Sequence, residues 1–168
     1  MTERQSYSGI PLKPVYTPAD VAGLDYAKRL NDPGAYPYTR GRRPATQEAG
    51  GWIQHELSGE GTPLRSNAQF RYLIAHGATG VDVIGDTPTM AWLDPDHPAA
   101  VHAVGTQGVS LCRLEDYREL YDGLPLDRIT VSHSLPAPFA IAGLYLSAKA
   151  RGVDPKGLRG SAIQVPFY

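Results

Sequence analysis

The chain has 168 residues, enough for one domain with a buried core. Its formal net charge is −1, so no overall positive field attracts nucleic acid or an acidic membrane surface. The single cysteine, Cys112, excludes an internal disulfide framework and a cysteine-rich zinc site.

No apolar run is long enough to span a membrane, and the N-terminal residues lack the apolar core of a signal peptide. We therefore expect a soluble cytoplasmic protein that binds neither nucleic acid nor membrane. We also expect no bound metal, because Asp96 and His97 have no further ligands near them in the sequence.

Residues 1–35 are predicted to form an N-terminal arm followed by a helix. The arm shows no hydrophobic periodicity and contains several prolines, which favours an extended segment that lies along another surface. A hydroxyl residue at Thr17, then Pro18 and an acid, is typical of a helix start. This helix is predicted to run to about Leu30 and to stop at the Asn-Asp-Pro-Gly of residues 31–34.

An arginine- and tyrosine-rich loop follows at residues 36–44, with the sequence YPYTRGRRP. Proline and glycine keep the segment out of regular structure, so its side chains are displayed on a loop. Guanidinium groups bind phosphate in bidentate geometry, and tyrosine rings can stack on a base. Composition alone leaves two interpretations open: a clamp for a phosphorylated, ring-bearing ligand, or a solvated basic loop.

The remainder of the chain is predicted to alternate strands with helices. Residues 45–61 are polar and glycine-rich and are expected to form a loop, and residues 87–108 likewise. Helices are predicted at 63–76, 114–122 and 138–151 from caps, apolar spacing and terminal glycines. Strands are predicted at 81–85, 129–133 and 161–165 from short β-branched runs.

Strands that alternate with helices imply a parallel sheet with right-handed crossovers. In such sheets, ligands are bound by residues just past the carboxyl ends of the strands. Three parallel strands also make an incomplete sheet, whose free edge suggests that another polypeptide supplies the rest. The residues that this rule selects are Asp86, Thr87, His133, Ser134, Gln164 and Val165.

A series of landmarks resembles the cobalamin-dependent acyl-CoA mutases, such as methylmalonyl-CoA mutase. No landmark is specific alone, but their order and spacing match that family from about residue 10 to the C-terminus. The landmarks are YPYTRG at 36–41, SN at 66–67, AHGATG at 75–80, DPDHP at 94–98, GTQGV at 105–109, YDGLPLD at 121–127, and LRG followed by IQ at 158–164.

The resemblance implies an α/β fold, namely a partial TIM (β/α)8-type barrel with an N-terminal arm and about three parallel strands with crossover helices. It implies an arm and helix at 1–35, then a CoA-binding loop and the first part of the barrel at 36–168. It implies a substrate pocket that includes Gln47, Asp86, His133 and Gln164. This chain departs from the methylmalonyl-type pattern at Gln47 and His133, and beside the other two at Gly85 and Val165. No catalytic residue is assigned. The residues implied to contact CoA are Tyr36, Tyr38, Thr39, Arg40, Arg42 and Arg43, of which Arg42 and Arg43 depart from the family pattern.

The function that the resemblance implies is a small subunit, or split N-terminal part, of a cobalamin-dependent acyl-CoA mutase. It would bind a CoA thioester for radical carbon-skeleton isomerisation together with a larger partner chain. That partner would supply the other strands and most contacts to adenosylcobalamin, because the family's Asp-x-His-x-x-Gly signature and catalytic histidine are absent here.

A second hypothesis is a non-catalytic CoA-binding or assembly protein derived from a mutase barrel, and the departures at Gln47, His133 and Val165 favour it. A third, a nucleotide-phosphate enzyme that uses the arginine loop, lacks a glycine-rich phosphate motif.

Overall fold

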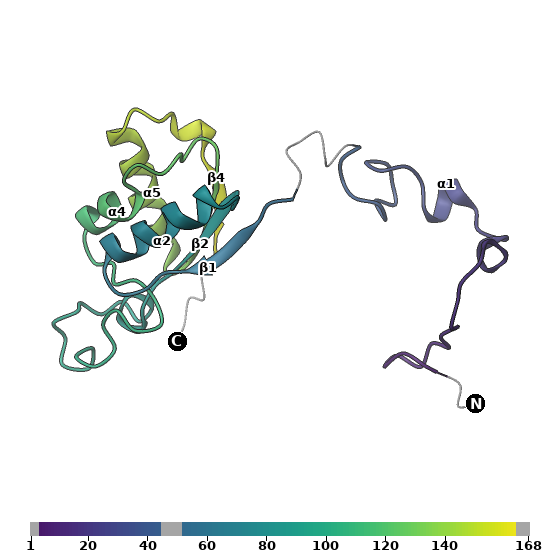
Figure 1. Ribbon diagram of the computed structural model, residues 1–168, viewed down its shortest axis with the longest axis horizontal. Helices are drawn as coiled ribbons and strands as arrows, with labels where there is room; N and C mark the ends of the chain where they lie inside the picture. The colour runs from purple at the N-terminus through teal and green to yellow at the C-terminus, as the bar shows by residue number, and fades with distance from the viewer. Residues whose placement is uncertain (1–3, 45–51, 164–168) are drawn as a thin grey trace. The chain divides into compact units, whose positions relative to one another are not determined.

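The computed structural model describes residues 4–44 and 52–163 (Figure 1). The chain divides into two units, residues 1–52 and 53–168. The 36–44 loop belongs to the first unit. The sequence predicts a boundary after residue 35, because residues 36–44 are expected to bind CoA. That functional boundary stays a prediction.

Among its described residues, the first unit contains two short helices, η1 (Pro18–Val21) and α1 (Tyr26–Arg29). The prediction of one continuous helix to Leu30 is therefore wrong. The reason lies at residues 22–25, where Gly23 weakens the helix and Asp25 begins a new one. The Asp25 side chain accepts a hydrogen bond from the Lys28 backbone N–H, which caps α1 at its N-terminus.

The second unit is an α/β structure with a parallel four-stranded sheet in the order β1-β2-β3-β4. The strands are β1 (His55–Ser58), β2 (Gly80–Ile84), β3 (Thr130–Ser134) and β4 (Arg159–Ala162). The helices are α2 (Pro63–Ala75), α3 (Thr87–Met90), α4 (Leu114–Tyr121), α5 (Ala137–Ala150) and η2 (Pro155–Gly157). The predicted α/β fold class is confirmed, and the structure is consistent with a partial TIM-like barrel.

Three details of the sequence-based prediction are wrong. Strand β1 lies in a segment that was expected to be a loop, because its sequence, HELS, has no apolar run. The strand forms by pairing its backbone with that of β2. Strand β4 begins two residues earlier than residue 161, at Arg159. Helix α3 lies within the expected loop 87–108, although it has a side-chain cap at Asp86 and a proline in its first turn, as α2 does.

The hydrophobic core lies between the sheet and the helices. Helix α2 packs beside α4, and α4 beside α5, in the order of the strands that they connect (Figure 1). Alternation along β2 and β3 decides which side chains enter this core. Val81, Val83 and Val131 are almost fully buried in it, whereas Asp82 and Ser134 face the other side of the sheet, which remains partly exposed.

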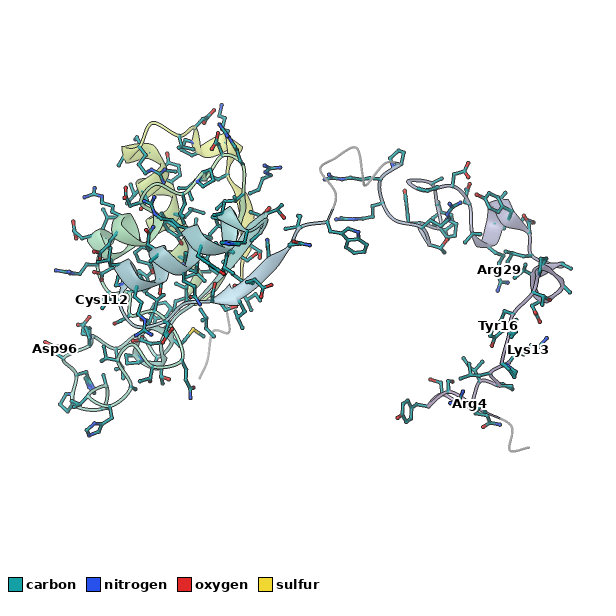
Figure 2. The ribbon with its side chains drawn as sticks, in the orientation of Figure 1. Arg4, Lys13, Tyr16, Arg29, Asp96 and Cys112 are labelled. Atoms are coloured by element: carbon teal, nitrogen blue, oxygen red, sulfur yellow. The ribbon has the colours of Figure 1, made fainter. Side chains whose placement is uncertain are left out.

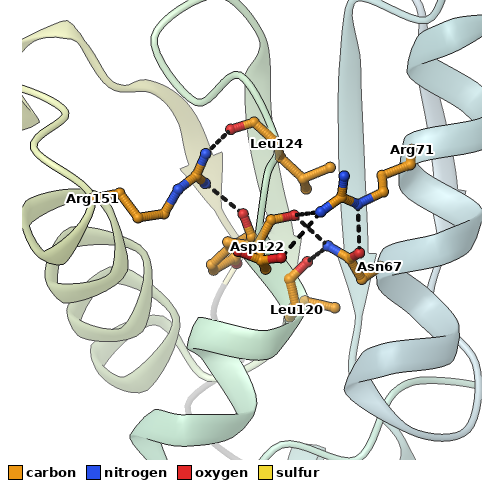
Figure 3. Close-up of polar contacts among 7 residues, drawn as sticks. Asn67, Arg71, Leu120, Asp122, Leu124 and Arg151 are labelled. Carbon is orange, nitrogen blue, oxygen red and sulfur yellow. Dashed lines mark hydrogen bonds and ion pairs between the residues drawn. The ribbon is translucent and has the colours of Figure 1, made fainter.

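A polar cluster closes the C-terminus of α4 (Figure 3). The Asn67 amide of α2 donates to the Leu120 and Asp122 carbonyls, over 2.9 and 2.8 Å. The guanidinium group of Arg71 donates to the Asp122 carbonyl over 2.8 Å, and that of Arg151 to the Leu124 carbonyl over 2.7 Å. Side chains of two neighbouring helices thus satisfy carbonyls that lie beyond the helical hydrogen-bond pattern.

Candidate functional site

A hollow of about 530 Å³ lies at the carboxyl ends of the parallel strands. Ile84 and Ser134 are the last residues of β2 and β3, and Ile163 follows β4. Thr87 and Met90 of α3 contribute to its wall, and so do Gly85, Ala91 and Gln107. This is the edge at which parallel α/β sheets bind their ligands, because side chains from several strand ends converge there.

A second, smaller hollow of about 260 Å³ lies on the helix-covered side of the sheet. It is lined by α4, α5 and the segment after α3, where the Trp92 and Phe139 rings meet at a centroid distance of 5.1 Å. It does not reach the strand ends. The hollow at the strand ends is therefore the better candidate for a ligand site.

Polar side chains extend from this hollow along the exposed face of the sheet. The Ser134 hydroxyl donates to the Asp82 carboxylate over 3.2 Å, and the Ser161 hydroxyl donates to the Ser132 hydroxyl over 2.9 Å. Strand register places Asp82 beside Ser132, and Ser132 beside Ser161. This face offers hydroxyl and carboxylate groups, which suit a ligand that carries amides and carbonyls.

Asp86 is fully buried, with 0% exposure, directly after β2. One carboxylate oxygen accepts from the Thr89 N–H over 2.9 Å, and the other accepts from the Gly105 N–H over 2.7 Å. The carboxylate thus caps α3 and ties the 105–109 segment to it. Its geometry favours a structural role, and the pocket role that the sequence suggested for it stays a prediction.

His133 is 2% exposed and lies on the helix-covered face of β3. Its Nδ1 atom lies 3.2 Å from the Ser161 carbonyl, which can only accept, so Nδ1 carries the proton. Its Nε2 atom then accepts from the Tyr121 hydroxyl over 2.6 Å. Burial lowers the pKa of His133, so the ring is neutral and joins β3, β4 and α4. Its predicted place in a substrate pocket remains untested.

The 36–44 segment is a loop of turns, as predicted, and it lies in the first unit. Backbone N–H groups of Gly34 and Tyr38 donate to the carbonyls of Gly41 and Ala35, over 2.9 and 2.8 Å. Tyr36 and Tyr38 are 75% and 52% exposed, with their rings in an edge-to-face arrangement. The loop therefore holds its backbone in place and leaves two aromatic faces accessible.

The remaining loop residues differ in how they are held. The Thr39 hydroxyl donates to the Leu30 carbonyl over 2.6 Å, and Arg40 donates to the Tyr26 hydroxyl over 2.9 Å. Arg42 and Arg43 are exposed. The structure thus brings the six predicted CoA-contacting residues onto one loop, and their binding role stays a prediction. Gln47 and Gln164, the other two predicted pocket positions, lie outside the described residues.

Cys112 and Asp96 lie in the second unit (Figure 2). Desolvation raises the pKa of the Cys112 thiol to about 11, and a hydrogen bond to the Asp116 carboxylate adds to the effect. The thiol is therefore protonated near neutral pH, which does not suit a nucleophile. Within residues 4–44 and 52–163, no group of three or more His, Cys, Asp or Glu side chains gathers to hold a metal ion. None of the helices described is both long and apolar enough to cross a membrane.

Gln107 lines the hollow and was missed by the strand-end rule. It belongs to a long segment that leaves the sheet after β2 and returns to it before α4. Hydrophobic periodicity does not predict that a segment of this kind comes back to the sheet. The flanking glycines, Gly105 and Gly108, were the only local indication that this backbone makes a close approach.

The parallel sheet, the helices packed beside one another and the hollow at the strand ends define an α/β protein of the partial TIM-like barrel class. Within this class, the family model described as methylmalonyl-CoA mutase matches residues 5–165. The chain belongs to the methylmalonyl-CoA mutase family, which confirms the resemblance seen in the sequence.

Individual relatives agree with this assignment. The methylmalonyl-CoA mutase large subunit of Streptomyces virginiae is 39% identical over 91% of this chain and 21% of its own length. The methylmalonyl-CoA mutase of Cereibacter sphaeroides is 36% identical over 91% of this chain and 22% of its own length. The 2-hydroxyisobutanoyl-CoA mutase large subunit of Aquincola tertiaricarbonis is 34% identical over 90% of this chain and 27% of its own length. The chain thus spans about a fifth to a quarter of the relatives it matches.

Proposed function

We propose that this chain supplies a CoA-binding loop and one wall of the substrate barrel of a cobalamin-dependent acyl-CoA mutase. The observation that supports this most directly is the hollow at the strand ends of a chain in the methylmalonyl-CoA mutase family. The reaction would be the isomerisation of a CoA thioester's carbon skeleton. The relatives are named for two different acyl groups, so the acyl group stays open.

The 36–44 loop would bind the CoA portion of the substrate. Arg40, Arg42 and Arg43 carry guanidinium groups that neutralise phosphate, and the exposed rings of Tyr36 and Tyr38 offer stacking faces. Backbone hydrogen bonds hold the loop before a ligand arrives, which reduces the entropic cost of binding.

The exposed face of the sheet and its hollow would hold the rest of the substrate. Hydroxyl groups of Ser134 and Ser161 can pair with amides along the ligand. Apolar side chains of the hollow, such as Ile84 and Met90, would exclude water around the acyl end. Adenosylcobalamin, when bound, supplies the radical chemistry, and the protein keeps the substrate in place.

The described residues do not fit the cobalamin group itself. The family's Asp-x-His-x-x-Gly signature is absent from the sequence, and the spacing of Asp94, Asp96 and His97 does not match it. We therefore assign most of its contacts to a larger chain that also completes the barrel. In keeping with this, β1 and β4 have no further strand neighbour among residues 52–163.

A non-catalytic CoA-binding or assembly protein is the second candidate. The buried, fully hydrogen-bonded His133 favours it, because that side chain offers no free group for chemistry. Reconstitution with a larger chain that carries the remaining strands separates the two: turnover of a CoA thioester supports the mutase, and binding without turnover supports the second candidate. A well-folded monomer that recruits no such chain would exclude the split barrel.

Replacing Arg40 with alanine is expected to weaken CoA binding about tenfold or more, because a charge-assisted hydrogen bond to phosphate contributes about 1.5–3 kcal/mol. Isothermal titration of the full chain with CoA measures this. Arg29→Ala is the matched control, because Arg29 is an exposed arginine of α1 outside the loop. An unchanged affinity in Arg40→Ala would remove the role assigned to the loop.

A further inference from the structure

Gln107 holds an unfavourable backbone conformation at the rim of the hollow. Its φ angle is +57°, in the left-handed region that side-chain-bearing residues rarely adopt. Such a conformation is unfavourable for a residue other than glycine. Glycine would remove this cost, so a glutamine here points to a use for its side chain.

The side chain of Gln107 is available for a ligand. It is exposed and lines the hollow together with Thr87 and Ser134. Its carboxamide makes no hydrogen bond to any of the residues that the structure describes. A carboxamide both donates and accepts, so it can pair with a carbonyl or an amide of a bound molecule.

Asp86 holds one end of the segment that carries Gln107. Its buried carboxylate accepts from Thr89 in α3 and from Gly105, two residues before Gln107. Hydrogen bonds of backbone N–H groups to a carboxylate are stronger than neutral ones. A single side chain thus couples two parts of the wall of the hollow, helix α3 and the 105–109 segment.

Backbone hydrogen bonds hold the C-terminal end of the 105–109 segment. The Val109 N–H donates to the Ile84 carbonyl over 2.9 Å, and the Asp86 N–H donates to the Val109 carbonyl over 3.0 Å. Val109 therefore forms bridges to both Gly61 and Gly85, past the ends of β1 and β2. With both ends fixed, the conformation of Gln107 is determined by its surroundings rather than by its own preference.

We infer that Gln107 is a ligand-contacting, specificity-determining residue of the hollow, and that Asp86 is the positioning residue that holds it there. The ligand group would be a carbonyl or amide of the acyl-CoA thioester. This inference rests on the proposed function, because that function supplies the ligand. Contact with the ligand would account for a glutamine, rather than a glycine, at this strained position.

The first test replaces Gln107 with glycine, which accepts the left-handed conformation and lacks the carboxamide. The unfolding midpoint is expected to stay the same or to rise, whereas the dissociation constant for an acyl-CoA thioester rises about tenfold. Gln107→Asn retains a carboxamide and tolerates this backbone region, so it should restore part of the affinity. Titrations with acetyl-CoA, succinyl-CoA and free CoA distinguish contact with the acyl end from contact with the CoA arm.

The second test replaces Asp86 with asparagine and follows backbone amides by NMR. The Gly105 amide proton should move upfield when its carboxylate acceptor is lost, the Gln107 signals should shift, and thioester affinity should fall about tenfold. Asp154→Asn is the matched control. Asp154 also caps a helix, accepting from the Lys156 N–H over 3.0 Å, but it lies at η2, outside the residues that line the hollow.

The outcomes are distinct. If the wild-type chain binds thioester and Gln107→Gly binds it equally well, the inference is wrong and the proposed function stands. If Asp86→Asn leaves the Gln107 signals and the affinity unchanged, Asp86 is not a positioning residue. If the wild-type chain binds no CoA compound, alone or with its larger chain, the proposed function and this inference both fail.

Discussion

Replacing Gly108 with alanine is expected to lower the free energy of unfolding by about 3 kcal/mol, because overpacking against a rigid backbone has costs of this order. A Cβ atom at residue 108 would lie 2.3 Å from the Gly85 carbonyl group and 2.5 Å from the Asp86 nitrogen. These are backbone atoms at the end of β2, so no side-chain rotation relieves the contact. The 105–109 segment would have to move away from the sheet.

Chemical denaturation of the purified protein, together with any chain that co-purifies, measures this effect. Gly157→Ala is the matched control, because a Cβ atom there meets no atom within 4 Å and its φ angle is not in the left-handed region. Gly108→Ala should also weaken thioester binding, since it displaces the rim of the hollow. A stability equal to that of the control would show that the segment is not held as tightly as these contacts indicate.

Replacing Asn67 with alanine is expected to lower the free energy of unfolding by about 2 to 3 kcal/mol, because a buried carbonyl left without its donor costs roughly 1–3 kcal/mol and the hydrogen bond from Arg71 is lost as well. Asn67 is 5% exposed, donates to two carbonyls at the end of α4, and accepts from Arg71 over 2.8 Å (Figure 3). Removing its amide leaves the Leu120 carbonyl without this donor.

Denaturant unfolding of Asn67→Ala and Arg118→Ala gives the comparison. Arg118 also lies on α4, but its 3.5 Å ion pair with Glu115 is exposed, so its loss should cost less than about 1 kcal/mol. Thioester affinity should remain unchanged in both variants, because α4 leads into β3 and its C-terminus therefore lies at the amino end of the sheet. Equal unfolding free energies for the two variants would contradict the role of the cluster.

The two ends of the sheet are expected to differ in function. Contacts at the amino end, around Asn67, are expected to affect stability alone. Contacts at the carboxyl end, around Asp86 and Gly108, serve stability and also shape the hollow. The same separation is general in parallel α/β barrels, where loop variation at the carboxyl end changes chemistry without disturbing the fold.

Much of the fold could be predicted from local sequence. Proline after a hydroxyl residue marked the start of α2, and terminal glycines marked the ends of α2 and α5. Valine-rich β2 was predicted nearly in full. Strands β1 and β4 were harder, since neither HELS nor RGSA has a strand-like apolar pattern. They form because a neighbouring strand offers its backbone groups, which is a tertiary effect.

The candidate site was predicted less completely, because it combines segments distant in the chain. Two residues that the strand-end rule selected, Thr87 and Ser134, line the hollow. The rule also selected Asp86 and His133, whose polar atoms are occupied by other parts of the protein. Whether a strand-end side chain faces the hollow or the helices depends on its exact register, because a shift of one residue moves it to the opposite face of the sheet.

The sequence by itself determined the α/β class, the loop character of residues 36–44 and membership of the methylmalonyl-CoA mutase family, because these depend on local propensity and on ordered landmarks. Only the tertiary structure decided that His133 faces the helices and that Gln107 lies at the rim of the hollow. The physical reason is that both placements depend on hydrogen bonds between residues far apart in the chain. Asp86 meets Gly105, and His133 meets Tyr121 and Ser161, through contacts that no local pattern encodes.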